Sequence, residues 1–315
     1  MSWSNLNCAV TGGAGFIGSH VAETLSKKGA IVTVLDDLST GREANLELLY
    51  DLGVEFVQGS ILDKPLLEKT FTGMDYVFHY AALPSVPRSI ADPLLFSEVN
   101  LTGTLWVLEA ARQAGVKKVV YAASSSAYGD ISKLSKAEAQ AASPLSPYAV
   151  TKLAAEHYCV VYSLVYGLPT ASLRYFNVYG PRQNPNSRYA AVVPNFITAA
   201  MHGESPLIRG DGEQSRDFVF VDDAVRASLK AVLSSETDGI VVNIATGQRI
   251  TINKLAAAVI RLVGADVEPK YVAAQVGDIR HSLADISRAR KLIGYEPRYS
   301  LEQGLQKTVE YFIRQ

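Results

Sequence analysis

The 315-residue sequence has few cysteines, almost no net charge and no long apolar run. Only Cys8 and Cys159 are present, in an expected strand and an expected helix, so buried free thiols are favoured over a disulfide. The formal net charge of −1 gives no reason to expect a nucleic-acid partner. No apolar run approaches the ~20 residues of a membrane span, and the N-terminus lacks the basic segment and apolar core of a secretory signal. A globular cytoplasmic protein that binds neither membrane nor nucleic acid is expected.

Residues spaced as metal ligands are also lacking. The five histidines show no ligand spacing with the cysteines or with one another: His20, His79, His157, His202 and His281. We therefore expect no metal site. The sequence does contain 48% apolar residues, which over this length is enough for one large domain or two unequal ones.

A glycine-rich segment, residues 11–18, directly follows an expected strand at 7–11 and precedes apolar residues at helical spacing. Gly12 permits a tight turn, and Gly15 lets backbone N–H groups approach a pyrophosphate. Gly18 allows the helix to pack closely on the sheet, and the helix N-terminus then faces the phosphates. The segment therefore predicts a dinucleotide site.

A second expected strand, residues 31–35, ends at Asp36, 18 residues beyond Gly18. A carboxylate at this place can accept both hydroxyls of an adenosine ribose and would repel a 2′-phosphate. The prediction is therefore NAD rather than NADP, although Arg42 nearby argues the other way.

Short apolar runs alternate with helical patterns along the chain. Further strands are expected at residues 54–57, 76–80, 118–123, 170–174 and 241–244. This alternation predicts an α/β fold, a doubly wound parallel sheet of Rossmann type with a smaller C-terminal substrate-binding lobe interleaved with it. The expected division is an NAD-binding domain at 1–175, to which 216–247 returns, and a substrate-binding lobe at 176–215 and 248–315.

The longest expected helices are 93–114 and 146–165. The first carries an apolar stripe of Leu101, Leu105, Leu108 and Ala111, and the second one of Ala154, Tyr158, Tyr162 and Val165. These stripes fit either packing against the sheet or a seam between two subunits, and periodicity alone does not separate the two. One further helix is expected to begin at Thr251, and the last helix is expected to span 301–313. The turn-rich segment 180–188 is expected to form a loop that wraps a ligand.

A tyrosine and a lysine suggest base catalysis. Ser146 suits a helix N-cap and Pro147 its first turn, so Tyr148 and Lys152 fall four residues apart on one helical face. An ammonium beside the phenol, joined by the positive ring of an oxidised nicotinamide, favours the phenolate and lowers its pKa from about 10. Tyr148 can then act as a base near neutral pH. Ser124 would hydrogen-bond the same substrate hydroxyl and guide its proton.

With these features the chain resembles the extended short-chain dehydrogenase/reductase superfamily, and within it the nucleotide-sugar 4-epimerases. The shared motifs follow in order over nearly the full length: residues 11–18, Asp36-Asp37, His79-Tyr80-Ala81-Ala82, Asn100, residues 124–129, Tyr148 with Lys152, and residues 173–181. More narrowly, residues 85–89, 180–185 and 215–218 are similar to those of UDP-N-acetylglucosamine 4-epimerases, which also links the chain to UDP-glucose 4-epimerases.

This resemblance implies a set of contacts. NAD would contact Gly12, Gly15, Phe16, Ile17, Gly18, Asp36, Asp37, Ser60, Ile61, Tyr80, Ala81, Ala82, Asn100, Ala122, Tyr148, Lys152 and Tyr175. The UDP-sugar would contact Ser85, Arg88, Ser124, Ser125, Ser126, Tyr148, Asn177, Val192, Leu207, Arg209, Arg216, Asp278 and Ser282. Tyr148, Lys152 and Ser124 would be catalytic, and Asn177 with Arg216 would bind the diphosphate.

The implied reaction inverts C4 of a UDP-hexose through a transient 4-keto sugar, with the hydride held on bound NAD and returned to the opposite face. Ser282 resembles a gate position at which enzymes limited to glucose and galactose carry tyrosine. UDP-GlcNAc and UDP-GalNAc are therefore expected as substrates along with UDP-Glc and UDP-Gal. Three residues depart from the family pattern: Gln275 replaces an arginine on the diphosphate, Pro84 a lysine, and Ser60 an aspartate at the adenine. The positive charge of the arginine that Gln275 replaces would then come from Arg216 alone or from Arg280.

Other functions remain open. A UDP-glucuronate 4-epimerase or decarboxylase is the main alternative, because Arg88, Arg182 or Arg188 could bind a sugar carboxylate. A 4,6-dehydratase needs an added acid and base, which Ser125 and Ser126 do not supply. A non-enzymatic NAD-binding module would have little reason to keep the catalytic trio. The expected assembly is a homodimer.

Overall fold

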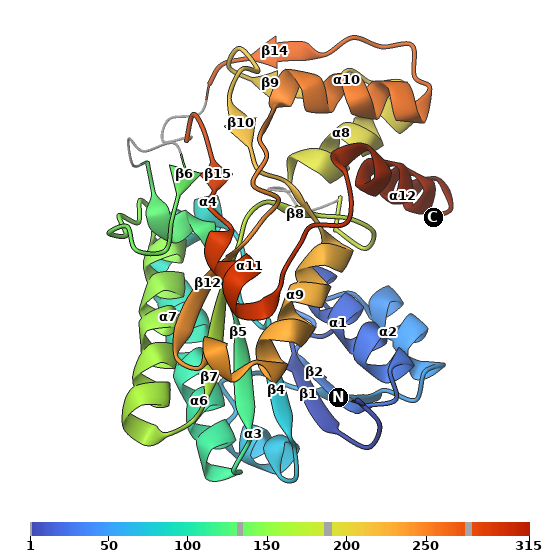
Figure 1. The fold of residues 1–315 in the computed structure, drawn as a ribbon. Helices are drawn as coiled ribbons and strands as arrows, with labels where there is room; N and C mark the ends of the chain where they lie inside the picture. The colour runs from blue at the N-terminus through green and yellow to red at the C-terminus, as the bar shows by residue number, and fades with distance from the viewer. Residues whose placement is uncertain (1, 131–134, 186–190, 275–278) are drawn as a thin grey trace.

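The computed structural model describes residues 2–130, 135–185, 191–274 and 279–315. At its centre is a seven-stranded parallel sheet with the strand order β12-β7-β5-β4-β1-β2-β3 (Figure 1). These strands are β1 (Asn7–Thr11), β2 (Ile31–Asp36), β3 (Glu55–Gln58), β4 (Tyr76–His79), β5 (Lys118–Ser124), β7 (Thr170–Tyr175) and β12 (Ile240–Ile244). The direction of winding reverses between β1 and β4, the point at which doubly wound sheets bind their ligands. The predicted fold class is confirmed.

Alternate strand residues pack on opposite faces of the sheet. Val10 belongs to the apolar core under α1 (Phe16–Lys27), α2 (Glu43–Tyr50) and α9 (Val221–Leu233). Its neighbour Ala9 belongs to the core under α3 (Lys64–Phe71), α6 (Gly103–Gln113) and α7 (Pro147–Tyr166). Because both faces are covered, the central strands are mostly apolar, and each fully buried Val or Leu contributes about 1.5–3 kcal/mol relative to exposure.

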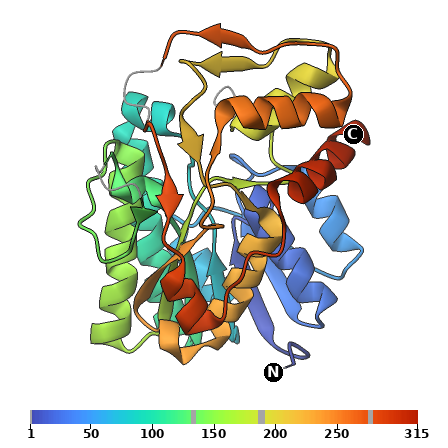
Figure 2. The ribbon, with the colours of Figure 1, turned by 45° about the horizontal axis from the view of Figure 1, so that its top comes forward.

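The smaller lobe lies at the carboxyl ends of the strands (Figures 1 and 2). Its helices are α8 (Val192–Met201), α10 (Ile252–Val263) and α12 (Leu301–Ile313), and its short strand pairs are β9 (Leu207–Arg209) with β14 (Lys270–Val272) and β10 (Ser215–Arg216) with β13 (Ile250–Thr251). The Thr251 side chain accepts a hydrogen bond from the Lys254 N–H and caps α10, and Ser300 with Gln303 forms a capping box on α12. Both predicted helices are confirmed.

Several shorter elements lie between the long ones. They are α4 (Val86–Ala91), α5 (Pro93–Ser97), a 3₁₀ turn (Ser125–Tyr128), the parallel pairs β6 (Ser135–Lys136) with β15 (Leu283–Ala284) and β8 (Val178–Tyr179) with β11 (Val219–Phe220), a second 3₁₀ turn (Ser235–Thr237) and α11 (Ser287–Ile293). Within the described part of the chain, no helix is long and apolar enough to cross a bilayer.

The stretch predicted as helical at 93–114 is helical from Pro93 to Gln113, but it is not one regular α-helix. It is divided into α5, a π-helical turn (Glu98–Thr102) and α6. The widened turn places the Asn100 side chain against the Leu83 backbone, where its Oδ1 accepts from Leu83 N–H at 2.8 Å and its Nδ2 donates to Leu83 O at 3.1 Å. Apolar periodicity carries no signal for such a turn, which is often found at functional sites.

The two apolar stripes predicted on the helices at 93–114 and 146–165 are only partly buried. Leu108 and Ala111 on α6 and Tyr162 on α7 are buried, whereas Tyr158 and Val165 on α7 are exposed. The helix α7 therefore packs one face on the sheet and leaves apolar side chains on its outer face.

Candidate active site

A cleft of about 2160 Å³ lies between the carboxyl ends of the strands and the smaller lobe. Parallel strands bring residues that are far apart in sequence to this one edge, among them Gly12 after β1 and Ser124 at the end of β5. Most of the expected contact residues line it: Gly12, Gly15, Phe16, Ile17, Gly18, Asp36, Asp37, Ile61, Tyr80, Ala81, Ala82, Ser85, Arg88, Ala122, Ser124, Ser125, Ser126, Tyr148, Tyr175, Asn177, Val192, Leu207, Arg209, Arg216 and Ser282.

Among the described residues, three expected contacts do not line the cleft: Ser60, Asn100 and Lys152. Asn100 and Ser60 use their side-chain oxygens on backbone N–H groups, those of Leu83 and Leu62 respectively. Lys152 is buried behind the cleft wall. Asp278 lies outside the described residues, as do Gln275 and Arg188.

The glycine loop allows a close backbone approach. Gly12 has φ +72°, and a Cβ on it would lie 2.5 Å from the Ala81 nitrogen. A Cβ on Gly18 would lie 2.2 Å from the Gly12 carbonyl oxygen. The helix α1 begins at Phe16, and no side chain of the described residues caps it. Its first N–H groups are therefore directed towards a ligand, and with the helix dipole they favour an anion.

Asp36 stands at the other side of this loop, at the end of β2. Its Oδ2 accepts a hydrogen bond from Ala14 N–H at 3.0 Å, and its Oδ1 accepts one from Leu38 N–H at 2.8 Å. Burial raises the pKa of this carboxyl, and the two backbone donors oppose the shift. An ionised carboxylate has about four acceptor positions, so two remain for a pair of ribose hydroxyls.

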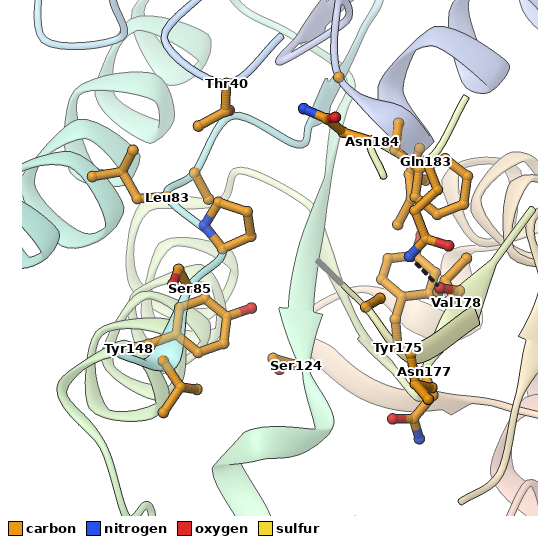
Figure 3. Close-up of a pocket in the computed structure, with 18 of the residues that line it drawn as sticks. Thr40, Leu83, Ser85, Ser124, Tyr148, Tyr175, Asn177, Val178, Gln183 and Asn184 are labelled. Carbon is orange, nitrogen blue, oxygen red and sulfur yellow. Dashed lines mark hydrogen bonds between the residues drawn. The ribbon is translucent and has the colours of Figure 1, made fainter. Parts of the chain in front are cut away.

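The phenol oxygen of Tyr148 points across the cleft towards Ser124 (Figure 3). Ser124 Oγ accepts hydrogen bonds from Ser126 N–H at 3.2 Å and Ser126 Oγ at 2.8 Å, so its own proton is left to donate. Ser146 caps α7 as predicted, accepting from the Ala149 N–H, and this begins the helix one residue before Tyr148. The structure thus brings the expected base and the expected serine together.

The pKa of Tyr148 differs from the expectation. Burial raises it, and the hydrogen bond with Ser124 opposes the rise. Lys152 Nζ lies 4.4 Å from the centre of the Tyr121 ring, in a cation–π contact. Burial lowers the pKa of Lys152 to about 7, with Cys159 and Glu156 opposing the shift. The expected lowering combined the ammonium with the positive ring of a bound nicotinamide; among the groups of the protein alone, burial is the largest effect, because it penalises the charged forms of both Tyr148 and Lys152.

Residues of the substrate side meet at the base of the smaller lobe. Asn177 has φ +31°, and its Nδ2 donates to the Asp217 carbonyl at 3.0 Å. The Asp217 carboxylate accepts from the N–H groups of Thr246, Gly247 and Ala284, which fixes the loops around it. Asp217 is thereby engaged with backbone and holds these loops rather than a ligand.

The two candidate diphosphate cations are placed differently. Arg216 lines the cleft, with its Nη1 donating to Ser215 O at 3.0 Å. Arg280 does not line it, because both of its Nη atoms bind the two carboxylate oxygens of Asp211 at 2.8 Å. This geometry favours Arg216 as the cation that faces a ligand.

Comparison with known proteins identifies the chain's relatives. The model of the NAD-dependent epimerase/dehydratase family matches residues 8–245. The chain belongs to this family. The UDP-glucose 4-epimerase of Mycolicibacterium smegmatis is 40% identical over 311 residues, which cover 96% of this chain and 97% of that protein.

Solved structures are similar over almost the whole length. A UDP-N-acetylglucosamine 4-epimerase from Methanobrevibacter ruminantium M1, in complex with UDP-N-acetylmuramic acid, has a TM-score of 0.95 and 41% identity and covers 99% of both chains. A UDP-glucuronic acid 4-epimerase mutant from Bacillus cereus, in complex with UDP-4-deoxy-4-fluoro-glucuronic acid and NAD, has a TM-score of 0.91 and 32% identity and covers 98% of this chain and 99% of that one. These relatives and the family model make the chain an epimerase with NAD as its cofactor.

The described residues fit that cofactor. The loop around Gly12 and Gly18 has no room for side chains, the first turn of α1 is free for a pyrophosphate, and Asp36 is placed for a ribose. No group of three or more His, Cys, Asp and Glu side chains in the described ranges is arranged to hold a metal ion. Cys8 and Cys159 are buried free thiols, as predicted, and burial raises the pKa of each to about 12.

Five charged residues that line the cleft were not among the expected contacts of the epimerase: Arg42, Lys136, Arg182, Glu204 and Lys270. Lys136 on β6 is almost fully buried, and its Nζ donates to Gly129 O at 2.7 Å. Arg182 was noted only for a sugar carboxylate, yet its guanidinium binds Glu23 and Ser19 on α1. A sequence signal existed for Arg182, because the turn-rich segment 180–188 predicts a ligand loop. Lys136 stands in a segment without periodicity, and no signal marked it.

Proposed function

We propose that this epimerase inverts C4 of a UDP-hexose, with UDP-GlcNAc and UDP-GalNAc as one substrate pair and UDP-Glc and UDP-Gal as another. The observation that carries the proposal is the direction of the Tyr148 phenol, which points at Ser124 inside the same cleft as the glycine loop (Figure 3). A sugar carbon held between Tyr148 and the nicotinamide site could lose a proton from its hydroxyl and a hydride from its C–H bond.

Tyr148 would take the proton of the 4-hydroxyl as a phenolate, while Ser124 donates a hydrogen bond to the same oxygen. Bound NAD supplies a hydride acceptor and a positive ring, and this charge lowers the phenol pKa that burial raises. The 4-keto sugar would turn about its diphosphate link, recover the hydride on its other face and recover the proton from Tyr148. The reaction returns every atom and electron, so no second redox substrate is needed.

The diphosphate would lie on Arg216 and Asn177, and the uridine against Val192, Leu207 and Arg209, all of which line the cleft. Ser282 also lines it and is only 6% exposed, so its small side chain sets the width of the cleft there. A tyrosine in its place would fill space that a 2-acetamido group requires. This supports the N-acetylated pair as substrates.

A uronate substrate is the second candidate, because one of the arginines considered for its carboxylate is open to the cleft. Arg88 is exposed at the cleft wall on α4. Arg182 is already engaged with Glu23 and Ser19. Of the two described candidates, Arg88 is therefore the one open to bidentate binding of the carboxylate of a UDP-glucuronate, and Arg188 lies outside the described residues.

We propose a cytoplasmic homodimer as the working form. The two buried thiols suit a reducing compartment. The outer face of α7 exposes Val161, Leu164, Val165 and Tyr166, a patch that a second copy could cover.

The test is chromatography of the products after incubation with UDP-GlcNAc, UDP-Glc and UDP-GlcA in turn, without added NAD. We expect conversion of the first two to their C4 epimers. Ser282→Tyr should lower turnover of UDP-GlcNAc by at least about ten-fold and spare UDP-Glc, because steric exclusion of a group from a pocket acts on one substrate only. Tyr148→Phe serves as the variant without a base and should lose about 10²–10⁴-fold in kcat.

Equal losses of both pairs in Ser282→Tyr would reject the gate. Release of carbon dioxide, or formation of UDP-galacturonate, would favour the uronate function instead. Unchanged turnover in Tyr148→Phe would reject the proposed mechanism.

A further inference from the structure

A chain of buried polar side chains begins at the end of β1, next to the glycine loop. Thr11 Oγ1 lies 2.7 Å from His79 Nδ1, and His79 Nε2 lies 2.9 Å from Thr104 Oγ1 on α6. All three residues are at most 1% exposed. Polar groups so deeply buried are costly unless each is paired, so this connection is under strong geometric constraint.

The number of hydrogens fixes the direction of these bonds. Thr104 donates its one hydroxyl hydrogen to the Asn100 carbonyl at 2.7 Å, since a carbonyl can only accept. Thr104 Oγ1 must then accept from His79, which places the imidazole hydrogen on Nε2. The bare Nδ1 accepts in turn from the Thr11 hydroxyl. Burial, and after it the charge of Lys152, lowers the pKa of His79 to about 3, so the ring stays neutral.

The connection continues into the helix that carries the base. Asn100 Nδ2 donates to Thr151 Oγ1 at 3.3 Å, and Thr151 Oγ1 donates to the Tyr148 carbonyl at 2.9 Å. Asn100 thus accepts from the Thr104 hydroxyl with its backbone carbonyl, and its side-chain amide donates to Thr151 on α7. The π-helical turn places both groups of Asn100 where they are needed.

A neutral imidazole also suits the charge nearby. The His79 ring lies 5.6 Å from the Tyr121 ring, over which the Lys152 ammonium is placed at 4.4 Å. An imidazolium would add a second positive charge beside this buried ammonium and would remove the acceptor that Thr11 requires.

We infer that His79, as the neutral Nε2–H tautomer, is a positioning residue that ties the glycine loop at the end of β1 to the first turn of α7, and so sets Tyr148 against the bound nicotinamide. This inference rests on the proposed function for its catalytic consequence. Its structural part, the tautomer and its partners, stands on the hydrogen-bond geometry alone.

The test uses the full-length protein with NAD. Nitrogen-15 NMR of histidine-labelled protein reads the tautomer, and the His79 signal is the one lost in His79→Asn. We expect Nε2 to carry the hydrogen from about pH 5 to about pH 9. Thr104→Val removes the acceptor of that hydrogen while keeping the shape of the side chain, and Thr104→Ser keeps the hydroxyl.

Thr104→Val should lower kcat by about 10- to 100-fold with KM for the sugar nucleotide almost unchanged, because a small misplacement of Tyr148 acts on the chemical step. Thr104→Ser should restore most of the rate. Thr170→Val is the matched control: Thr170 is equally buried and donates to the Cys159 carbonyl at 2.7 Å, at the far end of the sheet. It should cost similar stability and leave kcat unchanged.

An Nδ1–H tautomer, or titration of His79 near pH 6.5, the ordinary value for histidine, would overturn the inference. Equal kcat values for Thr104→Val and Thr170→Val would overturn it as well. A wild-type protein that converts none of the UDP-sugars would instead reject the proposed function, and the NMR result would still decide the tautomer.

Discussion

Two lysines are buried to the same degree but are held in different ways. Lys118, 3% exposed, donates to Ser234 O, Thr237 Oγ1 and Asp238 Oδ1 at 2.5–2.7 Å. Lys152, 4% exposed, rests over the Tyr121 ring. Burial lowers the pKa of both, and for Lys118 the Asp238 carboxylate opposes the shift. A buried charge with few oxygen partners is a cost to the fold, and such a cost is typical of a functional residue.

Lys152→Met should therefore stabilise the protein while abolishing turnover. The expected gain in the free energy of unfolding is on the order of 1–4 kcal/mol at about pH 6, because an apolar side chain replaces a buried charge. Lys118→Met should destabilise, since it removes the hydrogen bonds to the Ser234 carbonyl and the Thr237 hydroxyl and the ion pair with the Asp238 carboxylate. Thermal unfolding of the two variants beside the wild type measures both effects.

The gain from Lys152→Met should depend on pH. The pKa of Lys152 is about 7 in the folded protein and lower than in the unfolded chain. Between these two values the unfolded state binds more protons, so the stability of the wild type rises with pH through this window. The advantage of the variant is thus full below about pH 7 and smaller at about pH 9. An advantage that is equal at both pH values would contradict the buried-charge explanation.

At the scale of elements, sequence reasoning worked where a local signal was strong. The strand at 7–11, the cap at Ser146 and the helix at 301–313 follow from apolar runs and cap chemistry, and all three are confirmed. The π-helical turn at Glu98–Thr102 was missed because it depends on Asn100 meeting Leu83, a residue 17 positions away in sequence. Contacts of this kind appear only when the chain is folded.

The first turn of α1 gives the sharpest prediction at this scale. Gly18→Ala would place a Cβ 2.2 Å from the Gly12 carbonyl oxygen and push the helix away from the loop. We expect NAD retention to fall by at least about ten-fold, because the pyrophosphate depends on that close approach. NAD released from the denatured protein and quantified by chromatography measures the effect.

The control for this prediction is Gly115→Ala. Gly115 has φ +69° and no neighbour within 4 Å of an added Cβ. It should cost roughly 1 kcal/mol of stability through backbone strain and leave the NAD content unchanged. Equal NAD loss in both variants would show that general destabilisation, rather than the loop, releases the cofactor.

At the scale of the whole molecule, the motifs located the cleft but not all of its chemistry. Strand order alone places Gly12, Asp36 and Ser124 at one edge, so their meeting was predictable from the alternation of strands and helices. The pKa of Tyr148 was not predictable, because its direction depends on how deeply the folded lobes bury the phenol. Burial is a property of the assembled molecule and cannot be read from spacing.

Burial in the folded molecule also bears on the proposed dimer. Leu164 is 77% exposed and Val165 67% exposed on the outer face of α7, although both belong to an apolar helix. Leu164→Asp should therefore convert the proposed homodimer into a monomer. A symmetric interface would bury one such carboxylate from each subunit, and burial of each unpaired charge costs free energy. Light scattering after gel filtration should give a mass near 34.0 kDa for the variant and twice that for the wild type.

Leu48→Asp is the matched control, since Leu48 is a half-exposed leucine on α2, on the other face of the sheet. A wild type that is already monomeric, or a Leu48→Asp variant that also dissociates, would reject α7 as the interface. Leu164 lies near the C-terminal end of α7 and Tyr148 at its first turn, four turns away. Turnover by a folded Leu164→Asp monomer should therefore remain close to that of the wild type, and a large loss would mean that the partner subunit supports the position of Tyr148.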